Sequence, residues 1–183
     1  MFNIIAGADL WFENILLGVR TPFLLNVFNA ITLLGNTGVV ILVTGIVTII
    51  LFFNRCKSYA AGIIVAVAGA GITSYILKEI IKRARPDGLI PSSVETSFSF
   101  PSGHATAAIA LYGFLAYTLC KLYPKYNAAI ITLATLLILT IGFSRLYLGL
   151  HFPSDVIGGY FFGGIWLLVG IKVATLLKRS AIV

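Results

Sequence analysis

The chain alternates between long apolar runs and short polar breaks. Five runs approach the roughly 20 apolar residues that a helix needs to cross a membrane core of about 30 Å. They cover residues 37–53, 59–81, 104–119, 127–143 and 156–177. A sixth run, residues 22–34, is shorter and contains two asparagines, so it could span with a tilt or lie partly in the interface. The pattern predicts an all-α, polytopic transmembrane bundle of about six helices.

Residues 1–20 mix apolar and polar positions, with Trp11 and Phe12 beside Asp9 and Glu13. Such a pattern favours a helix that lies in the membrane interface, with a disordered terminus as the alternative. No repeat or domain linker interrupts the chain, and 183 residues suit one domain. We therefore expect a single membrane-embedded domain over residues 1–183, with an interfacial helix over 1–20.

Composition supports a membrane protein. Hydrophobic residues make up 59% of the chain and charged residues 10%, whereas soluble domains carry about 45–50% and about 25%. The net charge is +7, but the basic residues flank apolar runs or sit inside motifs, and they form no stripe with aromatic residues. We therefore expect membrane lipid as a partner and no nucleic acid. Cys56 and Cys120 are read as ordinary thiols.

Charge also predicts an orientation. If six helices alternate, one end of the bundle carries Arg20, Arg55, Lys57, Lys121, Lys125, Lys178 and Arg179. The positive-inside tendency makes that end cytoplasmic, with both termini inside. The opposite end carries Lys78, Lys82, Arg83, Arg85 and Arg145, so it is basic too. Those charges fall in segments that have a chemical explanation.

Three clusters of polar residues carry that chemistry. Lys78 and Arg85 are seven residues apart, so they share a helix face if the helix continues until Pro86 ends it. Pro101-Ser102-Gly103-His104 precedes an apolar run, where Ser102 suits an N-cap and the following N–H groups would point at an anion. The third cluster is Ser144-Arg145, followed by His151, Pro153 and Asp155.

Together the clusters predict a phosphate site. Arginine binds phosphate oxygens in a bidentate manner and lysine supplies a point charge. The sequence has no cluster of acidic residues to hold magnesium or calcium, so we expect no metal and no cofactor. A neutral imidazole can attack phosphorus while a nearby carboxylate fixes its tautomer, and a second imidazole can protonate the leaving oxygen.

The three clusters resemble the signature of the type 2 phosphatidic acid phosphatase superfamily, in the family's order and without a substitution. The resemblance implies that His151 is the nucleophile, Asp155 its orienting partner and His104 the general acid and then base. It implies that the phosphate is bound by Lys78, Arg85, Ser102, Gly103 and Arg145. It also implies a metal-independent enzyme with a six-helix core whose site lies near the outer surface of a membrane.

Several alternatives remain open on the sequence alone. An isoprenyl diphosphate such as undecaprenyl diphosphate, or phosphatidylglycerophosphate, is the favoured substrate, and a lipid A phosphatase is a rival of the same mechanism. A non-catalytic protein that binds or transports lipid phosphate is a rival of another class. The small size suits a bacterial-type enzyme of the plasma membrane, with an extracytoplasmic site. Lys82 and Arg83 are expected to reach towards lipid headgroups, and Asp87 and Glu95 to be solvated loop residues.

Overall fold

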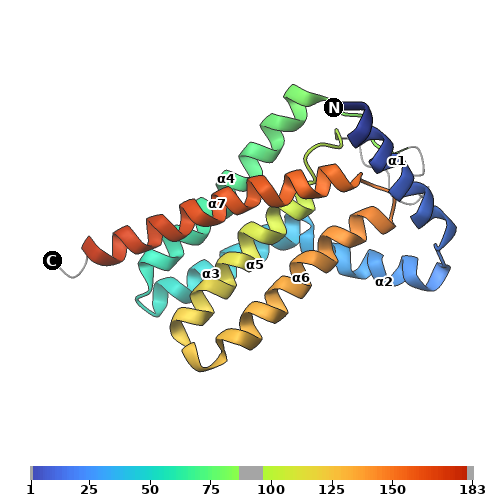
Figure 1. Ribbon diagram of the computed structural model, residues 1–183. Helices are drawn as coiled ribbons and strands as arrows, with labels where there is room; N and C mark the ends of the chain where they lie inside the picture. The colour runs from blue at the N-terminus through green and yellow to red at the C-terminus, as the bar shows by residue number, and fades with distance from the viewer. Residues whose placement is uncertain (1, 87–96, 181–183) are drawn as a thin grey trace.

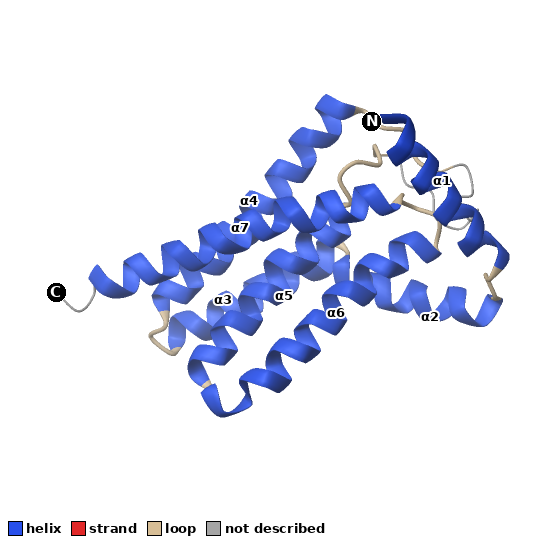
Figure 2. Cartoon of the chain, in the orientation of Figure 1, coloured by secondary structure: helices blue, strands red, loops and turns tan. Residues whose placement is uncertain are grey.

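The computed structural model describes residues 2–86 and 97–180, so Asp87 and Glu95 lie outside the described residues. Helices joined by short loops make up this part of the chain, and it contains no strand (Figures 1 and 2). The elements are α1 (Phe2–Gly18), α2 (Pro22–Thr32), η1 (Leu33–Gly35), α3 (Thr37–Phe53), α4 (Lys57–Ile81), α5 (Gly103–Leu122), η2 (Pro124–Tyr126), α6 (Asn127–Tyr147) and α7 (Pro153–Ser180). The predicted all-α bundle, with a further N-terminal helix, is confirmed.

Local sequence signals set where several helices begin. The Thr21 hydroxyl accepts a hydrogen bond from the Leu24 amide at 3.3 Å and caps α2. The Asn36 side chain caps α3 in the same way, accepting from the Gly38 amide at 2.9 Å. Such side chains satisfy amides that have no partner within the helix. A proline opens α7, where its missing N–H costs no helical bond.

By length and composition, the described helices allow four membrane crossings, or five if α2–η1 and α3 form one bent span. Four helical segments are long and apolar enough to cross a bilayer, and α2–η1 and α3, which meet at 47°, qualify only as a pair. The Nε of Arg20 donates to the Tyr147 carbonyl at 2.8 Å, so α2 starts where α6 ends. Arg20 therefore lies at the opposite end from Lys57 and Lys121, and the two termini lie at opposite ends of the bundle (Figure 1).

The core lies between α3, α4, α5 and α7, where Ile63, Leu111 and Phe114 are completely buried. Helix α7 approaches α5 closely because the residues of α7 that face α5 include glycines. A Cβ at Gly163 would lie 2.4 Å from the Thr106 carbonyl oxygen, and one at Gly159 would lie 2.7 Å from that of Ser102. This close packing brings the first turns of α5 and α7 together.

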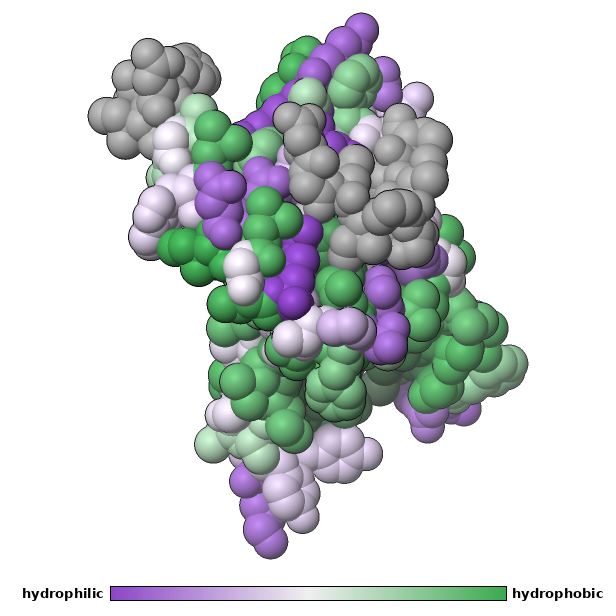
Figure 3. All heavy atoms as spheres, turned by 90° about the vertical axis from the view of Figure 1, so that its right-hand side faces the viewer, coloured by the Kyte–Doolittle hydropathy of each residue, from purple (hydrophilic) through white to green (hydrophobic). Residues whose placement is uncertain are grey.

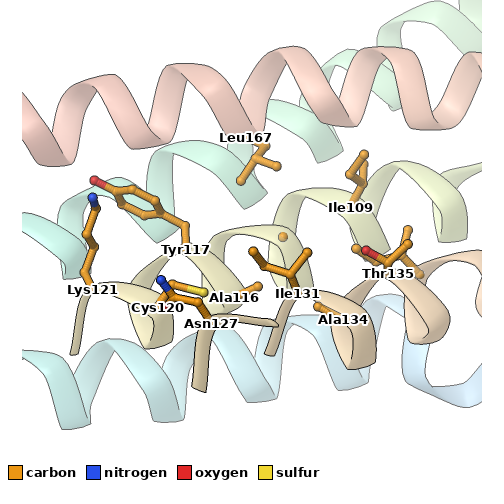
Figure 4. A pocket seen from close by; sticks show the side chains of 12 residues that line it. Ile109, Ala116, Tyr117, Cys120, Lys121, Asn127, Ile131, Ala134, Thr135 and Leu167 are labelled. Atoms are coloured by element: carbon orange, nitrogen blue, oxygen red, sulfur yellow. The ribbon is translucent and has the colours of Figure 1, made fainter. Parts of the chain in front are cut away.

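The outer faces of the helices are apolar, as a protein surrounded by lipid requires. Phe53 is 79% exposed and Ile80 is 71% exposed. Figure 3 views the α1–α2 side and shows hydrophobic residues over much of that face, with most hydrophilic residues between its top and its centre. A groove of about 460 Å³ separates parts of α5, α6 and α7 and is lined by mainly apolar side chains, among them Ile109, Ile131 and Leu167 (Figure 4).

Candidate active site

His151 is the buried centre of the candidate site, in the loop between α6 and α7. An Nη1 of Arg85 lies 3.2 Å from its Nε2. Because arginine can only donate, Nε2 must be the acceptor and Nδ1 must carry the proton. That Nδ1 faces the Ser99 hydroxyl at 3.4 Å and Oδ2 of Asp155 at 3.5 Å. The lone pair on Nε2 is thus directed towards the cations.

The environment keeps the His151 ring neutral. Burial, together with the positive charges of Arg145 and Arg85, lowers the pKa of His151 from its ordinary value of 6.5 to about 4. The hydrogen bond and charge of Asp155 act in the opposite direction but do not outweigh burial. At neutral pH the imidazole therefore has the protonation state that a nucleophile needs.

Asp155 has different partners for its two carboxylate oxygens and is completely buried. Its Oδ2 accepts hydrogen bonds from the Ser99 hydroxyl and from the Phe152 amide, the latter at 2.9 Å. Its Oδ1 accepts from Nη1 of Arg83 at 2.7 Å. The predicted closeness of Asp155 to His151 is confirmed, and the carboxylate is fixed on both sides.

Lys78 and Arg85 converge on one point, although not along one helix. Helix α4 ends at Ile81, and Lys82 takes a left-handed conformation with φ 49°. The expectation of a helix continuing to Pro86 is therefore wrong. The chain instead pairs with the segment before α5, where the Ser99 amide donates to the Arg83 carbonyl at 2.9 Å.

The backbone of the segment before α5 accepts hydrogen bonds from both Lys78 and Arg85. Lys78 donates to the Phe98 carbonyl through its Nζ. Arg85 approaches the same carbonyl at 3.4 Å and also donates through Nε to the Ser97 carbonyl at 2.8 Å. Helix α4 and the extended segment after it thus bring the two cations together.

Arg145 and His104 complete the cluster. Arg145 lies in the last turn of α6, is only 2% exposed, and donates to the Thr32 hydroxyl at 2.9 Å. His104 is the second residue of α5 and packs against Gly35. Four groups lie within electrostatic range of His104, namely Lys78, Arg85, Arg145 and His151. Both histidines of the chain therefore share one cluster with three cations.

Ser102 caps the start of α5 by position but not by a side-chain bond. Its amide donates to the Asp155 carbonyl at 3.0 Å, while its hydroxyl is buried and has no hydrogen-bond partner in the described part of the chain. A buried polar atom in this state calls for a ligand or a water molecule. Gly103 follows Ser102 as the first residue of α5. Ser144, the remaining residue of the polar clusters, lies in α6, where its hydroxyl donates to the Ile141 carbonyl at 2.6 Å.

The arrangement agrees with comparisons to known proteins. The model of the PAP2 superfamily matches residues 59–179, which is most of the chain and includes all three polar clusters. The chain belongs to the PAP2 superfamily. The matched region contains Lys78, the first residue of these clusters, and Asp155, the last.

Individual PAP2 proteins show how far the similarity extends. Phosphatidylglycerophosphatase B of Bacillus subtilis (strain 168) is 35% identical over 165 residues, covering 88% of this chain and 80% of the relative. Lipid A 1-phosphatase of Rhizobium etli is 40% identical over 104 residues, which are 52% of this chain and 41% of that protein. The crystal structure of a transmembrane PAP2 type phosphatidylglycerolphosphate phosphatase from Bacillus subtilis superimposes with a TM-score of 0.86. It is 32% identical and covers 97% of this chain and 88% of that chain.

Three residues that contact the signature residues or each other were not predicted from the sequence to belong to the site. Arg83 was expected to reach towards lipid headgroups, but it forms ion pairs at 2.7 Å with both Asp155 and Asp9. Asp9 is only 2% exposed although it belongs to α1, the helix expected in the interface. Ser99 contacts both His151 and Asp155. Only Asp9 gave a signal in the sequence, because an acidic residue among apolar neighbours is a candidate for a functional site.

Proposed function

We propose that this protein is a membrane lipid phosphate phosphatase in which His151 is the nucleophile. The observation that carries the proposal is the placement of the buried His151 ring, with Nε2 beside Arg85 and Nδ1 beside Asp155 and Ser99. A neutral ring held this way has its lone pair pointing at a region of positive charge. A phosphate bound there would present its phosphorus to Nε2.

The reaction has two steps. Lys78, Arg85 and Arg145 bind the phosphate oxygens, assisted by the Ser102 hydroxyl and the Gly103 amide, and they stabilise the charge that develops on them. Nε2 of His151 forms a bond to phosphorus as the bond from phosphorus to the lipid oxygen breaks, and His104 gives that oxygen a proton. Water then attacks the phosphohistidine, His104 takes a proton from the water, and inorganic phosphate leaves.

A phosphatidylglycerophosphate-type lipid is the first candidate substrate, because the Bacillus subtilis relatives that this chain matches over most of its length carry that activity in their names. An isoprenyl diphosphate is the second and a lipid A phosphate the third. The side chains of the site bind the phosphate and do not distinguish one lipid from another. The lipid chain would stay in the bilayer against the exposed apolar faces of the helices.

The direct experiment is phosphate release from a panel of lipid phosphates and diphosphates in mixed micelles. We expect release by the wild-type protein, fastest with phosphatidylglycerophosphate, and none by a folded His151→Ala variant. The variant serves as the control for contaminating phosphatases. Lipid binding without release by the wild-type protein would reject the enzyme in favour of a binding or transport protein.

Metal independence is part of the proposal. Three cationic side chains converge near the two imidazoles, and they supply the charge compensation that a divalent ion supplies in many phosphatases. We therefore expect full activity after dialysis against EDTA. A loss on chelation that magnesium restores would contradict this part of the proposal.

The site is proposed to face the extracytoplasmic side. All four described acidic residues, Asp9, Glu13, Glu79 and Asp155, belong to the end of the bundle that holds the site. Among the described residues, the other end has no acidic residue, and its basic residues are Arg55, Lys57, Lys121, Lys125, Lys172, Lys178 and Arg179. The site end also carries basic residues, but Lys78, Arg83, Arg85 and Arg145 belong to the site cluster. The lysines and arginines outside that cluster are concentrated at the other end, which the positive-inside tendency makes cytoplasmic.

The native cysteines can test this orientation, because Cys56 and Cys120 both lie near the basic end. A membrane-impermeant thiol reagent added to intact cells should leave them unlabelled until the membrane is opened. A Lys82→Cys variant that lacks both native thiols should react at once, because Lys82 is exposed at the site end. The reverse labelling pattern would invert the proposed orientation.

A further inference from the structure

Arg83 joins two buried carboxylates at the edge of the site. Its Nη1 donates to Oδ1 of Asp155 and its Nη2 donates to Oδ2 of Asp9, each at 2.7 Å. The guanidinium also lies over the ring of Phe152, 4.5 Å from the ring centre. The side chains of Asp9 and Asp155 are 3% and 0% exposed. A planar, permanently charged fork suits such a double contact better than an ammonium group would.

This contact determines how the Asp155 carboxylate is turned. Its Oδ2 serves Ser99, the Phe152 amide and the Nδ1 side of His151, while Oδ1 faces Arg83. Without Arg83, one oxygen of a fully buried carboxylate would lose its charged partner, and the group could rotate. The imidazole that Asp155 orients would then lose its fixed position.

Asp9 holds Arg83 in turn and ties α1 to the start of α7. One oxygen of Asp9 accepts from the Ser154 amide at 3.0 Å, and the other accepts from the Ser154 hydroxyl. The Ser154 hydroxyl is also an acceptor for Nη1 of Arg83 at 2.6 Å. Ser154 directly precedes Asp155, so α1, the segment after α4 and the first turn of α7 meet at one bonded cluster.

From these contacts we propose that Arg83 is a positioning residue for Asp155 and that Asp9 anchors Arg83, so that helix α1 takes part in organising the active site. The inference rests on the proposed function, because it assigns Arg83 a role in orienting His151 through Asp155. Arg83 touches neither reacting atoms nor phosphate in this scheme. Its loss must therefore slow the chemical step without weakening phosphate binding.

Steady-state kinetics with three variants test this role. Arg83→Gln should lower kcat by about 10- to 100-fold, the scale on which small misplacements of reacting groups slow enzymes. The KM, and the inhibition constant of inorganic phosphate, should stay within about threefold because Lys78, Arg85 and Arg145 are unchanged. Asp9→Asn should lower kcat less, because its amide still packs on Ser154. The double variant should be no slower than Arg83→Gln, since the two residues act as one unit.

Lys82→Gln is the matched control, because it removes a positive charge from the neighbouring exposed residue and should keep wild-type kcat. Thermal unfolding in detergent identifies any variant that fails to fold, and Arg83→Lys, which keeps the charge but loses the fork, then replaces Arg83→Gln. It should show a kcat loss of the same kind.

Four results overturn the inference or its basis. A folded Arg83→Gln variant with wild-type kcat removes the positioning role, and so do losses in the two single variants that multiply in the double variant. A loss confined to KM and phosphate inhibition makes Arg83 a phosphate ligand instead. If the wild type releases phosphate and His151→Ala does not, these three outcomes count against the role of Arg83 and leave the proposed function in place. A wild type that releases no phosphate overturns the proposed function together with this role.

Discussion

The two ends of the helix bundle treat charge in opposite ways. At the site end, Arg83, Asp9, Asp155 and Arg145 are buried or half-buried, and each forms side-chain hydrogen bonds: Arg83 with both carboxylates, and Arg145 with Thr32. At the other end four lysines, Lys57, Lys121, Lys125 and Lys178, lie near aromatic rings. Lys121 lies 5.8 Å from the ring centre of Tyr117, and Lys178 the same distance from that of Tyr59.

The difference teaches which charges have a fixed geometry. Buried charges that are paired hold their partners in place, and removing one leaves another without compensation. Exposed cations near a membrane surface snorkel and move, so each contributes little to structure. We therefore expect substitutions of the buried, paired charges at the site end to change catalysis, and substitutions of the exposed cations at the other end to be nearly silent.

The sharpest form of this comparison removes one positive charge from each end. Arg145→Ala should lower kcat/KM by about 10³-fold or more, because an arginine that stabilises a transferring phosphoryl group contributes on that scale. Lys178→Ala should stay within about twofold, as surface substitutions usually do. Phosphate release with equal amounts of folded protein measures both. Similar losses at the two ends would contradict the comparison.

A loss of similar size, or somewhat less, is expected when the orienting carboxylate becomes an amide. Asp155→Asn should lower kcat by about 10³-fold, because the amide can turn its NH₂ group towards Nδ1 and favour the wrong tautomer of His151. The Ser99 hydroxyl also faces Nδ1 and limits the loss. Single-turnover rates separate this effect from substrate binding, and a rate near that of the wild type would show that Asp155 does not orient the ring.

The pH dependence should follow the lowered pKa of His151. Between pH 6.5 and about 4 the unfolded chain binds a proton on His151 that the folded chain does not. Stability should therefore fall as the pH drops through this window, with no contribution from His151 above it. The acidic limb of the pH profile of kcat/KM should lie near pH 4. Thermal unfolding measures the change in stability with pH, and steady-state rates measure the limb. A limb near 6.5 would indicate a solvated His151.

The smallest effect concerns the packing that brings α7 to α5. Gly163→Ala would place a methyl group 2.4 Å from the Thr106 carbonyl oxygen, so overpacking should cost about 1–3 kcal/mol of stability. Gly164→Ala is the matched control, because the nearest atom to its Cβ would lie at 3.8 Å. Thermal unfolding in detergent compares the stabilities of the two variants. Equal stability of the two variants would show that α7 can shift to accommodate the methyl group.

Much of the fold and site could be predicted because the signals are local. Apolar runs between polar breaks marked α3 to α7, and the spacing of His151 and Asp155 on one turn predicted their contact. The resemblance to a known signature gave roles to residues from three separate segments. Those roles remain proposals, although the structure places the residues in one cluster.

The rest depended on contacts between distant parts of the chain. Arg83 pairs with Asp9 across 74 residues, and Ser154 bonds Asp9 across 145, so neither pairing leaves a local pattern. The end of α4 at Ile81 was missed because Pro86 restricts only its immediate neighbour, whereas a backbone bond from Ser99 to Arg83 holds the following segment extended. Whether the short α2 crosses the membrane stayed open on the sequence, because hydropathy does not show the bend into α3.

The most direct test of the central claim is to trap the phosphorylated intermediate. Lipid substrate labelled with ³²P in the departing phosphate is mixed with the enzyme and quenched with alkali, in which phosphohistidine survives. We predict label on the protein within the first turnover, located at His151 by mass spectrometry and missing in His151→Ala. Label at another residue, or turnover with no labelled protein at any time, would contradict His151 as the nucleophile.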